Sequence, residues 1–190
     1  MVRVLLGSEP KAEVDAITTD GVRPLYIAAQ KGHAEVVELL LAGGADVRAS
    51  RRGGTALHVA AQNGRAGVVK VLLDSGAGSS ASEDGSTPLL AAAEKGHVEV
   101  VKLLLEKFPD AVNESRANDG VTPLHAAAAN GQAETMRVLL DSGADVDAVN
   151  SQGATALRMA ARKGHREVVQ MLEQHKEVVK AAGLSETAGQ

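Results

Sequence analysis

Residues 87–97 read Thr-Pro-Leu-Leu-Ala-Ala-Ala-Glu-Lys-Gly-His, and five versions of this stretch occur along the 190-residue chain. The glycines of the five copies are separated by 32, 32, 35 and 33 residues. Each glycine is followed by a leucine-rich stretch, and the best copies then end in a turn such as Gly-Ala-Asp-Val at 44–47. A period of this size indicates small units that cannot bury an apolar face alone. We therefore expect the units to stack and to share one continuous core.

The residues of one unit predict its local structure. Thr87 suits a helix N-cap, Pro88 suits the first helical position, and Gly96 suits a left-handed C-cap. A second helix then begins near His97, with apolar residues at 100, 101, 104 and 105 on one face. Asp-Gly dipeptides at 20–21, 84–85 and 119–120 predict hairpin tips between units. Each unit should be helix, turn, helix and hairpin loop.

Composition and charge narrow the possible functions. The formal net charge of -4 leaves no excess of positive charge to neutralise phosphates, so we expect no nucleic-acid partner. The absence of cysteine excludes disulfides, thiolate metal sites and a cysteine nucleophile. The apolar run at the N-terminus is too short for a signal peptide. No run of about 18 consecutive apolar residues, the length needed to span a bilayer, is present. We therefore expect a soluble intracellular protein, cytoplasmic or nuclear, with no membrane insertion.

The Thr-Pro-Leu-His-x-Ala-Ala, Gly-His and Gly-Ala-Asp-Val elements resemble ankyrin repeats. The resemblance implies an all-α solenoid of stacked helix-turn-helix units linked by β-hairpin-like loops. We expect a single domain over 1–182, with a partial repeat at 1–18 and a disordered tail at 183–190. Full repeats are expected near 19–49, 50–81, 82–117, 118–149 and 150–182. Because the partial repeat at 1–18 lacks its first helix, the chain is expected to be a segment of a larger polypeptide.

Several positions depart from the repeat pattern. Arg23 replaces the expected threonine, Thr135 stands where a valine is expected, and Tyr26, Leu90 and Arg158 replace the histidine. Units without this histidine should lose side-chain hydrogen bonds and be weaker. The third loop is longer, with 107–110 in place of the Gly-Ala turn, which predicts a local irregularity.

The titratable residues do not suggest catalysis. Five of the six histidines fall at repeat positions, where stacking and capping explain them better than metal ligation, and His175 is expected to be solvated. The Gly-x-Gly-x-x-Ala pattern at 76–81 resembles a dinucleotide fingerprint, but a helix rather than a strand is expected before it. We expect no catalytic residue, no metal and no cofactor, and therefore not an enzyme.

The resemblance implies that the chain is a protein-protein interaction module or scaffold. Family members bind partners on a concave face formed by hairpin tips and first helices, at positions that stacking does not fix. Carried onto this chain, those positions are Thr19, Asp20, Val22, Gln30, Lys31, Arg51, Arg52, Gln62, Asn63, Glu83, Asp84, Ser86, Glu94, Lys95, Asn118, Asp119, Val121, Asn130, Ser151, Gln152, Arg162 and Lys163.

The charge along this face alternates, which suggests a partner of alternating charge, although solvation alone would also explain it. We expect a monomer that binds another protein. A stand-alone inhibitor or regulatory subunit of an enzyme is the alternative, and an enzyme without a recognisable motif is a more distant one. The identity of the partner does not follow from the fold.

Overall fold

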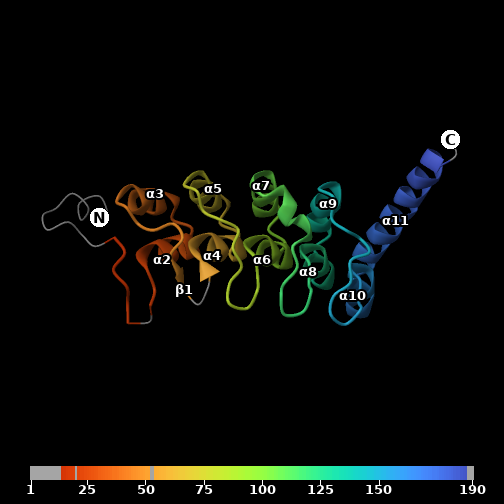
Figure 1. Cartoon of the computed structure of the whole chain (residues 1–190), viewed down its shortest axis with the longest axis horizontal. Helices are drawn as coiled ribbons and strands as arrows, with labels where there is room; N and C mark the ends of the chain where they lie inside the picture. The colour runs from red at the N-terminus through yellow and green to blue at the C-terminus, as the bar shows by residue number, and fades with distance from the viewer. Residues whose placement is uncertain (1–13, 20, 52–53, 188–190) are drawn as a thin grey trace, which may run out of the picture.

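The computed structural model describes residues 14–19, 21–51 and 54–187. Within these residues the chain forms five helix pairs. The pairs are α2 (Pro24–Lys31) with α3 (Ala34–Ala42), α4 (Ala56–Gln62) with α5 (Ala66–Asp74), α6 (Pro88–Lys95) with α7 (Val98–Lys107), α8 (Pro123–Ala129) with α9 (Ala133–Asp141), and α10 (Ala156–Lys163) with α11 (Arg166–Thr187). Figure 1 shows the first helices in one row and α3, α5, α7 and α9 in a second row, with α11 slanting away at the end and the connecting loops projecting from the row of first helices. The expected all-α solenoid is confirmed.

The third unit shows why these residues form these helices. The Thr87 side chain accepts a hydrogen bond from the Leu90 N–H, and Pro88 occupies the first helical position of α6. Gly96 ends the helix with φ 76°, in the left-handed region where a side chain would be strained. His97 is the N-cap residue of α7, but its side chain makes no capping hydrogen bond. In the first unit, Arg23 makes no side-chain cap for α2, as its departure from the pattern predicts.

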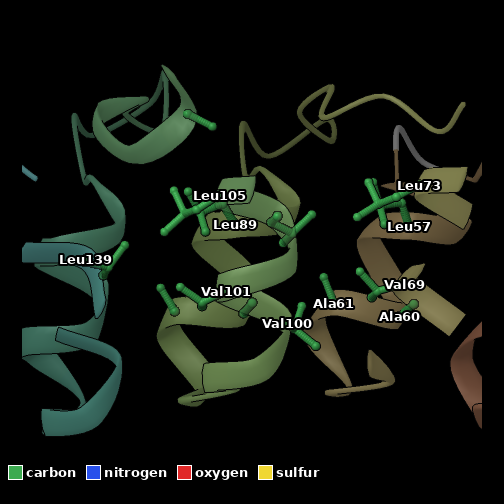
Figure 2. Close-up of a cluster of buried hydrophobic side chains, with 14 of the residues drawn as sticks. Leu57, Ala60, Ala61, Val69, Leu73, Leu89, Val100, Val101, Leu105 and Leu139 are labelled. Atoms are coloured by element: carbon green, nitrogen blue, oxygen red, sulfur yellow. The ribbon is translucent and has the colours of Figure 1, made fainter. Parts of the chain in front are cut away.

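Small residues and leucines build one core through the array. In α7 the four apolar residues at 100, 101, 104 and 105 are buried, and their apolar counterparts on α5 and α9 join the same cluster. Figure 2 shows part of this cluster, with Ala60 and Ala61 of α4 among larger side chains from other helices. Alanine at these positions allows neighbouring helices to approach closely. The continuous core expected from the period is confirmed.

Two loops differ from a simple repetition. The expected irregularity is a 3-10 helix, η1 (Pro109–Asn113), which takes the place of the Gly-Ala turn after α7. In the second unit the hairpin loop forms a short antiparallel ladder of β1 (Ser50–Arg51) and β2 (Gly54–Thr55). The segment 76–81 follows helix α5, so the glycine pattern there lacks the strand that a dinucleotide site needs.

The last unit ends the array with a more polar surface. Ala161 is exposed, although the matching alanines 29, 61, 93 and 128 are fully buried by the unit that follows each of them. Glu173 is exposed where the preceding two units carry the buried Leu105 and Leu140. Because no further unit covers this end in the described residues, a charged side chain here avoids an exposed leucine.

Helix α11 runs five residues beyond the domain end expected at 182. Residues 183–187, which were expected in a disordered tail, are helical, and no proline stands in this segment to stop the helix. Residues 188–190 of that tail, and 1–13 of the expected partial repeat, lie outside the described residues.

Candidate functional site

A groove of about 230 Å³ crosses three neighbouring units on the side of the first helices and hairpin loops. Helices α6, α8 and α10 and the loops before α8 and α10 contribute its residues. The apolar lining is Leu90, Val121, Ala126, Ala129 and Met159, and the polar lining is Glu94, Arg116, Asp119, Asn130, Asn150, Ser151 and Gln152. We call this surface the groove.

The floor of the groove is a small apolar cluster outside the main core. Leu90, Val121 and Ala126 pack together with exposed fractions of 0%, 7% and 6%. Leu90 stands at the position that His125 occupies in the next unit. The leucine therefore replaces a hydrogen-bonding side chain with an apolar contact to the following hairpin loop.

One edge of the groove is held by an ion pair. Arg116 donates from Nε to Asp119 Oδ1 at 2.9 Å and from Nη2 to Asp119 Oδ2 at 2.6 Å, which is a bidentate arrangement. Asp119 Oδ1 also accepts the Val121 N–H at 3.2 Å. The hydrogen bond from Arg116 lowers the pKa of Asp119, and the same bond raises the pKa of Arg116. The pair fixes the tip of this hairpin loop.

Hydrogen bonds join the hairpin loops of the third, fourth and fifth units. Asn118 donates from its side-chain amide to the Asp84 carbonyl at 3.0 Å, and the Ser151 N–H donates to the Asp119 carbonyl at 2.9 Å. Within its own loop, Asp84 accepts the Ser86 N–H at 3.1 Å and the Ser82 hydroxyl. The bond from Ser82 is the main cause that lowers the pKa of Asp84. Asp119 thus shapes a loop that lines the groove, and Asp84 shapes the neighbouring loop to which it is joined.

The repeat histidines serve the fold, as expected. His125 is fully buried, with Nε2 2.9 Å from the Ala154 carbonyl and Nδ1 2.8 Å from Thr122 Oγ1. His97 Nε2 lies 3.1 Å from the Gln62 carbonyl of the preceding unit. A methyl group placed on Gly64 would lie only 2.6 Å from the His97 ring, so the glycine makes room for this contact. In the described part of the chain, no three potential metal-ligating side chains lie close together.

Most of the predicted partner-contact residues are accessible. Exposed residues are Thr19, Gln30, Lys31, Gln62, Glu83, Asp84, Lys95, Asn118, Asn130, Ser151, Gln152, Arg162 and Lys163, and half-buried ones are Val22, Asn63, Glu94 and Asp119. Asp20 and Arg52 lie outside the described residues, and only the backbone of Arg51 is described.

Two of the predicted partner-contact residues are buried. Ser86 and Val121 are each only 7% exposed. Ser86 is buried because its N–H and carbonyl close the hairpin loop, and Val121 because it packs on Leu90. Their assignment as exposed contacts is wrong, although Val121 contributes to the floor of the groove.

The groove brings together only part of the predicted set. It includes Glu94, Asp119, Val121, Asn130, Ser151 and Gln152, and none of the residues predicted in the first two units. The repeat pattern did not predict the other groove residues, which are Leu90, Arg116, Ala126, Ala129, Asn150 and Met159. The sequence indicates an Arg116–Asp119 ion pair, because Arg116 stands three residues before Asp119 and has the opposite charge.

None of the helices in the described residues is long and apolar enough to span a bilayer. No curated protein sequence shows significant similarity to the chain. A family model for ankyrin repeats matches in three overlapping copies, at residues 1–82, 76–150 and 109–182. The matches, the helix pairs and the glycine caps agree, and the chain belongs to the ankyrin repeat family.

Proposed function

We propose that the chain is a protein-protein interaction module that binds a partner on the concave face formed by its hairpin tips and first helices. Ankyrin repeats are general protein-protein interaction modules. The partner, in this proposal, contacts chiefly the third to fifth units.

The observation that supports this proposal most is the groove itself. Its floor is apolar, its rim carries amides, hydroxyls and charges, and its volume is about 230 Å³. An apolar floor with a few convergent polar groups is the usual composition of a binding site. The loops that form the rim are tied to one another by hydrogen bonds, so little order has to be gained on binding.

The test begins with partners recovered by proximity labelling in the source cell and continues with binding titrations of each purified partner. One variant carries Ser151→Glu and Gln152→Glu on the rim of the groove, where both side chains are exposed. We expect it to bind its partner at least tenfold more weakly, because two carboxylates then stand where the partner approaches.

The control changes the net charge by the same amount on the opposite helix row. Lys70→Gln and Lys102→Gln lie on exposed positions of α5 and α7 and also change the net charge by two. We expect this variant to keep its affinity. Loss of binding in the control, with binding kept in the rim variant, would contradict the proposed face.

A further inference from the structure

The position two residues before each C-terminal glycine shows how charge changes across the groove. Its five occupants, in chain order, are Gln30, Gln62, Glu94, Ala129 and Arg162. Glu94 and Ala129 both line the groove, and Arg162 follows at the same position of α10, where it is exposed. A carboxylate and a guanidinium therefore stand two units apart on one face, with a small apolar residue between them.

The end of the groove near Glu94 is acidic. Glu83 and Asp84 are exposed in the hairpin loop of the same unit. The cation beside Glu94 is Lys95, whose Nζ lies 3.2 Å from Glu94 Oε1. That ion pair is open to solvent, with side-chain exposures of 49% and 38%, and so contributes little. Arg116 adds no free positive charge here, because Asp119 already holds it in two hydrogen bonds.

Helix α10 contributes Met159 to the groove, and the exposed residues of α10 beside it are basic. Arg158, Arg162 and Lys163 are all exposed on α10, although they do not line the groove. None of these three side chains forms an ion pair with another described residue. The apolar groove residues that remain half-buried are Ala129 and Met159, whereas Leu90, Val121 and Ala126 are buried.

The distance between the ends sets the length of a ligand. Packed helices lie roughly 8–10 Å apart, so two steps from α6 to α10 cover about 16–20 Å. An extended chain rises about 3.3 Å per residue, so about six residue steps cover this distance. Alternate side chains of such a segment point to the same side, which places residues 1, 3, 5 and 7 of a heptapeptide toward the groove.

From these charges and this length we infer that the groove binds an extended segment of a partner protein, with a cationic side chain at one end, aliphatic side chains in the middle and an anionic side chain at the other end. The cation lies by Glu94, the aliphatic side chains lie on the half-buried Ala129 and Met159, and the anion lies by Arg162. This inference rests on the proposed function and adds the chemistry of the partner to it.

Two labelled heptapeptides test the inference by fluorescence anisotropy at low ionic strength, where exposed charges are least screened. They are Lys-Ser-Leu-Ser-Leu-Ser-Glu and Glu-Ser-Leu-Ser-Leu-Ser-Glu, both blocked at their termini, which differ only in the charge of the first residue. The natural sequence should bind the first roughly tenfold more tightly, because in either chain direction the second replaces the attraction to Glu94 by a repulsion.

The decisive variant changes the charge at one end only. In Glu94→Arg, the preference should invert and Glu-Ser-Leu-Ser-Leu-Ser-Glu should become the tighter heptapeptide, because both ends of the site are then cationic. The matched control is Glu99→Arg, which makes the same charge change at an exposed position of α7 and should keep the original preference. Circular dichroism checks that both variants are folded. A third peptide, Lys-Ser-Ser-Ser-Ser-Ser-Glu, should lose most of the binding, because it has no aliphatic side chain for the floor.

Equal binding of the two heptapeptides, or failure of all of them to bind, would overturn the inference. So would a preference that does not invert in the Glu94→Arg variant. The proposed function is judged separately, on the natural partner and the Ser151 and Gln152 variant. If that partner depends on the rim while the heptapeptides fail, the segment chemistry is wrong and the binding face stands.

Discussion

The buried hydroxyl of Thr135 is the clearest local feature that lowers the stability of the array. Thr135 lies in α9, is 1% exposed, and its Oγ1 has no hydrogen-bond partner among the described residues. The matching positions of the other four units are Val36, Val68, Val100 and Val168. A buried hydroxyl without a partner costs about 1–3 kcal/mol of folding free energy.

We expect Thr135→Val to raise the free energy of unfolding by about 1 kcal/mol, because valine has nearly the same shape and no hydroxyl to desolvate. For a chain of this size, that corresponds to a rise of roughly 2–4 °C in Tm. Urea unfolding followed by circular dichroism at 222 nm measures the change. The denaturant midpoint should rise while the slope of the transition stays the same.

The same substitution in the same unit gives a control of opposite sign. Thr122 is buried too, but its Oγ1 accepts the His125 N–H and lies 2.8 Å from His125 Nδ1. Thr122→Val removes this N-cap and should lower the free energy of unfolding by about 1–2 kcal/mol. If Thr135→Val were neutral or destabilising, the Thr135 hydroxyl would have to be hydrogen-bonded, and the reasoning would be refuted.

Three further changes test the core, the buried histidines and the contacts between units. Leu104→Ala should cost about 2–5 kcal/mol in urea unfolding, because the leucine is 1% exposed, and a small cost would mean that it is not packed between helices. Burial lowers the pKa of His58 and His125 below the ordinary 6.5, so the unfolded chain binds protons more readily. Stability should be full above about pH 6.5 and fall as the pH drops below it, and a Tm that stays constant between about pH 7.5 and 5.5 would contradict this. His97→Gln should lower Tm modestly without loss of partner binding, because the lost contact is the one to the Gln62 carbonyl.

The fold was predictable because its signals are local and occur five times. Thr87, Pro88 and Gly96 specify the two ends of α6 through cap geometry alone, and the apolar face of α7 follows from helical spacing. The ends of the array were less predictable. Ala161 has the same local sequence as the other paired alanines, and its exposure depends on whether another unit follows.

The candidate site was predictable only in part, because position in the repeat does not fix exposure. Val121 occupies a hairpin position that the resemblance assigns to partner contact, yet Leu90 of the preceding unit covers it. Arg116 was missed because its loop has one extra residue. The Arg116 N–H bonds to the Val121 carbonyl, whereas the Ser82 N–H bonds to the Ser86 carbonyl, one residue closer in sequence.

The departures from the repeat pattern are what make the groove. Leu90 was expected to weaken its unit by removing a hydrogen-bonding histidine, but it is fully buried and forms the apolar floor instead. Ala129 has no polar side chain at a position that carries Gln62 in the second unit and Glu94 in the third, and this leaves open space over α8. Stacking requires neither change, since α4 and α8 carry histidine at the Leu90 position, α4 and α6 carry Gln62 and Glu94 at the Ala129 position, and all three helices pack in the same array. In an array of similar units, specificity for a partner can arise only where the units differ, and here Leu90 and Ala129 both differ within the groove.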